Sequence, residues 1–182
     1  MLSKIMLFCA NIIFFNAAGA KFFADRAGER AHIEEPRKLT QISEKDLAKV
    51  LNESYYNVHR KLPDENTLAS AWAHVALENN RGKRVWNYNL GNIGNSPHSR
   101  PAPVYDHFGK TKYRSYTTFV SAGEAYWRVI SKCKQAVVNF RLGYPKAAAI
   151  SLKRCNYYRA NEEQYSTALS SLYAEGLRKL RK

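Results

Sequence analysis

A single glutamate, Glu78, stands where the sequence predicts the apolar face of a helix. At about 100° of rotation per residue, Leu68, Trp72 and Val75 fall on one side, and Glu78 closes the edge of the same stripe. A carboxylate among apolar groups loses hydration, so we expect the pKa of Glu78 to be raised, which suits a general acid. The other interpretation is a solvated or capping glutamate in a last helical turn. His74, one turn earlier, is given no role.

The segment after this helix alternates aromatic, amide and glycine residues. Residues 79–82 read Asn-Asn-Arg-Gly and end the helix with residues that can adopt positive φ. Residues 86–94 read Trp-Asn-Tyr-Asn-Leu-Gly-Asn-Ile-Gly. Aromatic faces stack on sugar rings, amides bond hydroxyl groups, and glycines admit close approach. We therefore expect Tyr88, Asn89 and Asn92 to line a groove of sugar size.

A second carboxylate is the usual partner of such an acid in sugar chemistry, about 5–5.5 Å or about 6.5–9.5 Å away. The carboxylates after Glu78 are few: Asp106, Glu124, Glu162, Glu163 and Glu175. Only Asp106 lies in a predicted loop, within the proline-rich residues 95–109. Asp106 is therefore the possible second carboxylate. The alternative is a mechanism with one glutamate, completed by a group of the substrate or by a tyrosine.

Three pieces of the chain together resemble the lysozyme-like peptidoglycan hydrolases. They are Ala-x-x-x-Leu-Glu-x-x-x-Gly over residues 73–82, Tyr-Asn-Leu-Gly-Asn-Ile-Gly over residues 88–94, and Lys-Tyr-Arg-Ser-Tyr over residues 112–116. The pattern is most similar to the bacterial glucosaminidase branch, which includes the flagellar peptidoglycan hydrolases. Goose-type lysozymes and lytic transglycosylases share its fold core. The resemblance covers roughly residues 64–131 and departs at Gly91-Asn92, where Phe-Gly is commoner.

The resemblance implies a mostly helical α+β, lysozyme-like fold with a small β lobe or loop beside a helical core. It implies that Glu78 protonates the glycosidic oxygen of a peptidoglycan strand, without cofactor or metal. It also implies that a tyrosine-rich segment lines the cleft, and we expect Tyr116, Tyr157 and Tyr158 to bind substrate. Packing within a helical bundle is the alternative for each tyrosine, and the sequence does not choose between Tyr157 and Tyr158.

Capping residues predict where the helices start. Ser43, with Asp46, begins a helix that runs to about residue 57, and Asp64 begins the helix that carries Glu78. Residues 112–116 alternate as in a short strand. Thr117 or Thr118 then begins one long helix that runs to residue 142. Gly143 ends that helix, Pro145 starts a short one, and Asn161 with Gln164 caps the last.

The first twenty residues have the pattern of an export signal. Lys4 precedes an apolar run over residues 5–15, and Ala-Gly-Ala at residues 18–20 offers a cleavage site. We expect a signal peptide at 1–20, a flexible leader at 21–40 and a catalytic domain at 41–182, in a periplasmic or secreted protein. An uncleaved anchor is the alternative.

The chain is strongly basic, with a net charge of +14 over 182 residues. A basic exported protein is attracted to polyanions. We therefore expect it to meet peptidoglycan strands and an anionic cell-wall or outer-membrane surface. The basic residues are spread along the chain without a nucleic-acid motif, so we expect no specific nucleic acid partner. We expect a monomer.

Two cysteines, Cys133 and Cys155, remain once the signal is removed. An even count in an oxidising compartment favours one disulfide, with two buried free thiols as the alternative. Neither cysteine has a histidine at ligand spacing, so no metal site is expected.

Three functions remain open from the sequence. The first is a glycosidase of lysozyme, muramidase or N-acetylglucosaminidase type, with lytic transglycosylase chemistry possible at the same site. The second is a module of the same fold that binds wall glycan without cutting it. The third is a secreted basic protein that binds polyanions.

Overall fold

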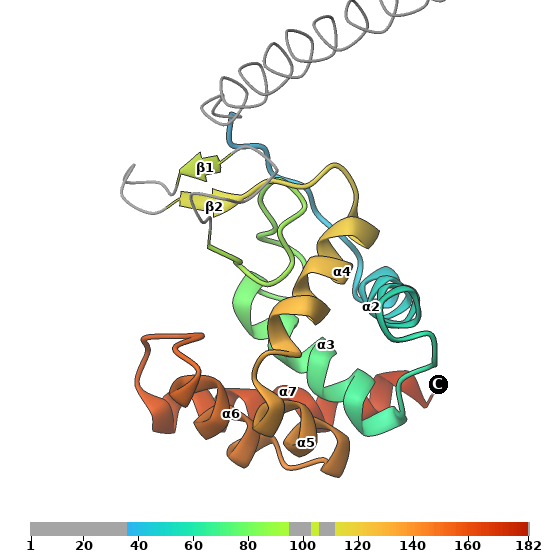
Figure 1. The fold of residues 1–182 in the computed structure, drawn as a ribbon, viewed down its shortest axis with the longest axis vertical. Coiled ribbons are helices and arrows are strands. Elements are labelled where there is room, and N and C mark those ends of the chain that lie inside the picture. Colours follow the sequence, from blue (N-terminus) through green and yellow to red (C-terminus); the bar gives the residue numbers. More distant parts are fainter. Residues whose placement is uncertain (1–35, 95–102, 106–111, 182) are drawn as a thin grey trace, which may run out of the picture.

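The computed structural model describes residues 36–94, 103–105 and 112–181. Within these ranges the chain forms six helices and a two-stranded antiparallel sheet (Figure 1). The helices are α2 (Glu44–His59), α3 (Glu65–Asn79), α4 (Phe119–Ile130), α5 (Lys134–Leu142), α6 (Pro145–Arg154) and α7 (Glu162–Leu180). Strands β1 (Pro103–Tyr105) and β2 (Lys112–Arg114) pair with Val104 opposite Tyr113. The predicted mostly helical α+β, lysozyme-like fold with a small β lobe is confirmed.

Helix α3 forms the centre of the domain. Every residue from Ala69 to Ala76 is buried, and a helix that is buried on all sides lies within a core. It packs against α7, α5 and α2. In Figure 1, α3 lies between the pair α2 and α4 and the group α5, α6 and α7. Trp72, predicted to be a core residue, is 1% exposed.

Local capping determines where three helices begin, as the sequence predicted. The side chain of Ser43 accepts a hydrogen bond from the Asp46 N–H at 3.1 Å. At α3 and α7, the capping side chain likewise accepts a hydrogen bond from the backbone N–H three residues ahead. The capping residues are Asp64 for α3 and Asn161 for α7. Helix α3 ends where Asn80 adopts a left-handed conformation with φ of 53°.

The single long helix predicted from residue 118 to residue 142 is wrong. Thr118 does cap α4, but the chain leaves the helix after Ile130 and begins α5 at Lys134. Residues 131–133 read Ser-Lys-Cys, with neither glycine nor proline to mark the break, which is why the sequence did not reveal it. The turn allows α5 to pack against α3 and α6.

Cys133 and Cys155 form the predicted disulfide, with their Cα atoms 6.0 Å apart. Cys133 is the N-cap of α5 and Cys155 is the C-cap of α6. The bond therefore joins the two ends of the α5–α6 hairpin just before residues 156–161.

Residues 38–40, at the end of the predicted leader, pair with the segment after α3. The Thr40 N–H donates to Val85 O, and the Asn87 N–H donates to Lys38 O, both at 2.8 Å. The predicted boundaries at residues 20 and 40 stay a prediction. The predicted signal peptide lies outside the described residues. No helix within the described ranges has the length and apolar character needed to cross a membrane.

Candidate active site

Glu78 lies in the last turn of α3, where the central helix reaches the segment formed by residues 87–94. Its side chain is 17% exposed, so most of the carboxyl is shielded while part of it meets solvent. The predicted position at the edge of the buried face is confirmed. A shielded group with one open side is a suitable proton donor to a bound substrate.

Two side chains hold the Glu78 carboxyl in place. The Tyr165 hydroxyl, from the first turn of α7, donates to Oε1 at 2.7 Å. The Asn92 amide donates to Oε2 at 3.3 Å and to the main-chain oxygen of Glu78 at 2.7 Å. Oε1 therefore faces the helical core, and Oε2 faces the segment that contains Asn92.

The pKa of Glu78 is raised, as the sequence predicted. Burial is the largest cause, since it disfavours the charged form, and the hydrogen bonds from Tyr165 and Asn92 act in the opposite direction. No lysine or arginine among the described residues contributes to this pKa. The carboxyl therefore keeps its proton to a higher pH than a free glutamate does.

Behind Glu78 lies a group of aromatic residues, of which the sequence assigned only Tyr157 to a site. His74 is fully buried, with Nε2 4.0 Å from Glu78 Oε1 and Nδ1 3.0 Å from the Tyr126 hydroxyl. The Tyr157 ring lies 4.6 Å from the His74 ring, between centroids. Burial lowers the pKa of His74 to about 3, so the imidazole is neutral.

Tyr157 and Tyr158 take different positions, which the sequence left open. The Tyr157 hydroxyl donates to Gly91 O at 2.7 Å, so Tyr157 joins the last aromatic loop to the segment beside Glu78. Tyr158 is buried, donates to Ala149 O at 3.1 Å and stacks on Tyr165 at 3.6 Å. Tyr158 therefore orients Tyr165, and contact of Tyr157 or Tyr158 with a substrate remains a prediction.

Asn89 also differs from its predicted sugar-facing position. Its side chain is buried, donates to Ile93 O and Arg114 O, and accepts from the Ile93 N–H. These bonds use the hydrogen-bonding capacity of the amide within the turn. Asn89 therefore shapes the segment around Glu78, whereas Asn92 contacts Glu78 itself.

Tyr88 belongs to the segment of residues 87–94, and Tyr116 is hydrogen-bonded to that segment. The Tyr88 ring packs edge-on against Phe119, with 4.8 Å between centroids. The Tyr116 N–H donates to Asn87 O at 2.9 Å, and its buried hydroxyl lies beside the Arg114 side chain. Contact of Tyr88 and Tyr116 with a substrate remains a prediction.

The predicted second carboxylate, Asp106, lies outside the described residues. Of the other carboxylates after Glu78, Glu124 pairs with Arg128, and Glu175 pairs with Arg81 and Lys179. Glu162 and Glu163 are exposed in the first turn of α7. Among the described residues, Glu78 is the carboxyl group with a raised pKa.

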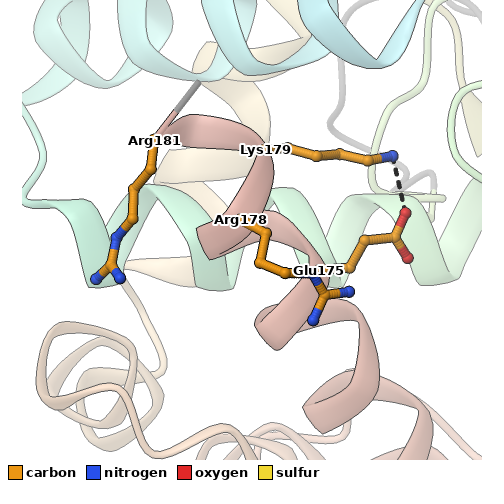
Figure 2. Close-up of a pocket in the computed structure, with 4 residues that line it drawn as sticks. All are labelled: Glu175, Arg178, Lys179 and Arg181. Carbon is orange, nitrogen blue, oxygen red and sulfur yellow. Dashed lines mark ion pairs between the residues drawn. The ribbon is translucent and has the colours of Figure 1, made fainter.

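A hollow of about 550 Å³ lies at the other end of α7, lined by Glu175, Arg178, Lys179 and Arg181 (Figure 2). Lys179 pairs with Glu175 and Glu44, and Arg181 pairs with Glu65. These ion pairs connect the end of α7 to the starts of α2 and α3. Lys179 and Arg181 therefore serve the packing of this end of α7, about 20 Å along the helix from Tyr165.

Comparison with solved structures identifies the same architecture elsewhere. The glycoside hydrolase domain of FlgJ from Salmonella typhimurium aligns with a TM-score of 0.54 and 18% identity, over 77% of this chain and 91% of that one. A C-terminally truncated form of that domain aligns with a TM-score of 0.52 and 16% identity, over 73% and 97%. The chain shares its fold with the FlgJ glycoside hydrolase domain. No protein-family model and no curated protein matches the sequence.

This likeness agrees with the resemblance seen in the sequence, which placed the chain nearest the flagellar branch of the lysozyme-like enzymes. The sequence did not identify Tyr165, whose spacing from Leu169 and Leu172 is that of an apolar face of the last helix. The only signal for His74 was its spacing of four residues before Glu78, which puts both on one helix face.

Proposed function

We propose that the chain is an exported peptidoglycan hydrolase that cleaves a glycosidic bond of the glycan strand, with Glu78 as the general acid. The observation that carries the proposal is the Glu78 carboxyl, 17% exposed and with a raised pKa, within the fold of a glycoside hydrolase domain. We place the proton on Oε2, because Oε1 accepts the shorter hydrogen bond, 2.7 Å from the Tyr165 hydroxyl, whereas Oε2 accepts the longer one, 3.3 Å from the Asn92 amide.

The first step transfers this proton to the glycosidic oxygen of a bound strand. The bond between that oxygen and the anomeric carbon breaks, the bonding electrons leave with the departing sugar, and an oxocarbenium-like centre forms. Glu78 is then a carboxylate. Tyr165 and Asn92 already donate to its two oxygens, so the new charge meets placed donors without rearrangement.

The second step adds a nucleophile to the oxocarbenium-like centre. Water gives hydrolysis, whereas a hydroxyl of the substrate itself gives an anhydro product, as in a lytic transglycosylase. Asp106 is the carboxylate we propose to assist the nucleophile in the hydrolytic route. We propose that Asn92, Tyr88 and Tyr116 line the cleft and contact the sugar.

Export and wall attachment complete the proposal. The Cys133–Cys155 disulfide supports an oxidising compartment, which is consistent with a cleaved signal peptide at 1–20. The net charge of +14 supports attraction to an anionic wall or outer-membrane surface by a monomeric enzyme.

The test is digestion of purified peptidoglycan, with mass spectrometry of the soluble fragments. The wild-type protein should release muropeptides, and Glu78→Gln should lower the release rate by at least a thousandfold while sedimenting with the wall as well as the wild type does. Reducing ends indicate hydrolysis, and anhydro ends indicate transglycosylase chemistry.

Two other results would replace the proposal. Sedimentation with the wall and no release by the wild-type protein would make the chain a glycan-binding module. Equal binding to wall and to nucleic acid, lost at high salt in both cases, would indicate a polyanion-binding protein.

A further inference from the structure

His74 has one ring nitrogen without a hydrogen-bond partner. Its side chain is fully buried, and no residue in the described part of the chain hydrogen-bonds Nε2. That nitrogen lies 4.0 Å from Oε1 of Glu78, one helical turn away on α3. Native structures rarely leave a buried polar atom unpaired, and one that faces a catalytic carboxyl has an evident partner.

The Tyr126 hydroxyl determines which nitrogen of His74 carries the hydrogen. If the hydroxyl donates to Nδ1 across their 3.0 Å separation, Nε2 carries the ring hydrogen. If Nδ1–H donates to the Tyr126 hydroxyl instead, the phenolic hydrogen has no acceptor among the described residues. In that case Nε2 is an acceptor without a donor. The first arrangement leaves one group unpaired, Nε2–H, whereas the second leaves two, the phenolic hydrogen and Nε2; because each unpaired buried group is costly, the first arrangement is favoured. It points an N–H at the Glu78 carboxyl.

The donor is uncharged. Rings of Tyr126, Phe140, Tyr157 and Tyr165 surround His74, and burial lowers the pKa of its imidazole to about 3. A neutral N–H favours a carboxylate over a carboxyl group far less than an imidazolium does. The Glu78 proton is therefore retained in the resting enzyme, while the donor remains available for the anion.

We propose that His74 is a positioning residue for Glu78: its Nε2–H, set by Tyr126, closes onto Oε1 once Glu78 has given its proton away. The loss of the Glu78 proton rests on the function proposed above, whereas the coupling between the two side chains does not. An ionised carboxylate accepts several hydrogen bonds, so Oε1 can take His74 as well as Tyr165. The separation of 4.0 Å between Nε2 and Oε1 describes the resting state, in which Tyr165 is the one donor to Oε1.

The groups that face Glu78 from the surrounding elements are all uncharged. They are His74 on α3, Asn92 in the segment after α3, Tyr126 on α4, Tyr157 after α6 and Tyr165 on α7. Tyr116, after β2, reaches this group through Tyr157. The one charge that forms in the cluster is therefore that of Glu78, and the direction of each donor decides how well it is stabilised.

The first experiment measures the ring tautomer of His74 by ¹⁵N NMR of the full chain. The chain has five histidines, and His74→Gln assigns the resonance. We expect a neutral ring with the hydrogen on Nε2 between about pH 5 and 8. Tyr126→Phe should move the population toward the Nδ1–H form. A wild-type ring that carries the hydrogen on Nδ1, or that is charged at pH 6, overturns the proposal.

The second experiment separates positioning from packing with two amides at position 74. Asparagine places its amide near Nδ1 and can satisfy Tyr126, whereas glutamine places its amide near Nε2 and can reach Glu78. The pKa of Glu78, measured by carboxyl ¹³C NMR and assigned with Glu78→Gln, should rise by about one to two units in His74→Asn and by less than half a unit in His74→Gln. The kcat of His74→Asn should fall about ten- to hundredfold.

The results distinguish this inference from the proposed function. If both amide variants lose thermal stability while the pKa of Glu78 stays within half a unit of the wild type, His74 only fills space and the inference fails. If His74→Asn shifts that pKa but the wild-type protein releases no wall fragments, the coupling stands and the hydrolase proposal fails.

Discussion

The acid strength of Glu78 depends on two effects that act in opposite directions. Burial raises its pKa, and the hydrogen bonds from Tyr165 and Asn92 lower it, with burial the larger. In the proposed reaction, the same two donors that oppose the shift in the resting protein stabilise the carboxylate after proton transfer. Removing a donor should therefore raise the pKa of Glu78 further and also slow the step that creates its charge.

Tyr165→Phe tests this balance. The variant keeps the stack on Tyr158 and loses the 2.7 Å hydrogen bond to Oε1. A hydrogen bond to a charged group contributes about 1.5–3 kcal/mol, so kcat should fall about ten- to hundredfold. The measurement is the rate of fragment release from purified wall at pH 6.

Tyr158→Phe is the matched control, because it also removes one hydroxyl and keeps the stack. That hydroxyl donates to Ala149 O and does not reach the carboxyl, so kcat should stay within about threefold of the wild type. Equal losses in the two variants would mean that Tyr165 acts only through packing.

At the scale of single residues, the sequence predicted Glu78 and Asn92 but not Tyr165. Helical periodicity puts Glu78 on the buried face, and its partner Asn92 follows 14 residues later in the same stretch. Asn89 looks the same in the sequence, but its bonds to Ile93 and to Arg114 O show that its side chain holds the turn together. Tyr165 is 87 residues from Glu78, so no local pattern connects them.

At the scale of elements, the segment of residues 87–94 is held against the helices by a close approach at Gly91. A Cβ atom there would lie 2.8 Å from the Tyr157 hydroxyl oxygen and 2.9 Å from a ring carbon of Tyr126. At this position the sequence departs from the pattern of the glucosaminidase branch that it resembles. The structure explains the glycine by the two rings that pack beneath it.

Gly91→Ala should displace these rings and the carboxyl next to them. Overpacking of this kind costs about 1–3 kcal/mol, so the melting temperature should fall by roughly 3–10 °C, and wall release should fall with it. Thermal unfolding followed by circular dichroism measures the loss.

Adding Tyr157→Phe removes one of the two close contacts. The double variant Gly91→Ala/Tyr157→Phe should therefore be less destabilised than the sum of the two single variants, because the substitutions are coupled. Strict additivity would show that the Tyr157 hydroxyl is not what the new methyl group meets.

Helix starts were predictable because caps are local. Ser43, Asp64 and Asn161 each bond a backbone N–H three residues ahead, and the sequence shows both partners. The division between α4 and α5 was not predictable, since residues 131–133 contain neither glycine nor proline and the reason lies in the packing of α5 against α3 and α6. The pairing of residues 38–40 with residues 85–87 likewise depends on contacts far apart in the chain.

At the scale of the whole molecule, the buried site makes stability depend on pH. The folded-state pKa of Glu78 lies above its unfolded value of 4.5, so its contribution to stability is fully present below that value and is lost as pH rises through the folded pKa. Glu78→Gln should therefore be more stable than the wild type at pH 7 to 8, by about 1.4 kcal/mol per unit of pKa shift. The difference should vanish near pH 4.

His74 contributes to the pH dependence of folding stability with the opposite sign. Its pKa is lowered to about 3, so its contribution is present above the unfolded value of 6.5 and is lost as pH falls toward 3. Wild type and Glu78→Gln share this effect, and it cancels in their difference. Urea unfolding of both proteins from pH 4 to 8 measures that difference, and a pH-independent value would show that Glu78 is not buried in solution.

The most direct test compares the pKa of Glu78 with the pH dependence of wall cleavage. We predict that kcat/KM for release of soluble fragments declines on the alkaline side with an apparent pKa equal to that of Glu78 by ¹³C NMR, and that Glu78→Gln releases none. Release by Glu78→Gln at a rate within tenfold of the wild type would contradict the assignment of this carboxyl as the proton donor.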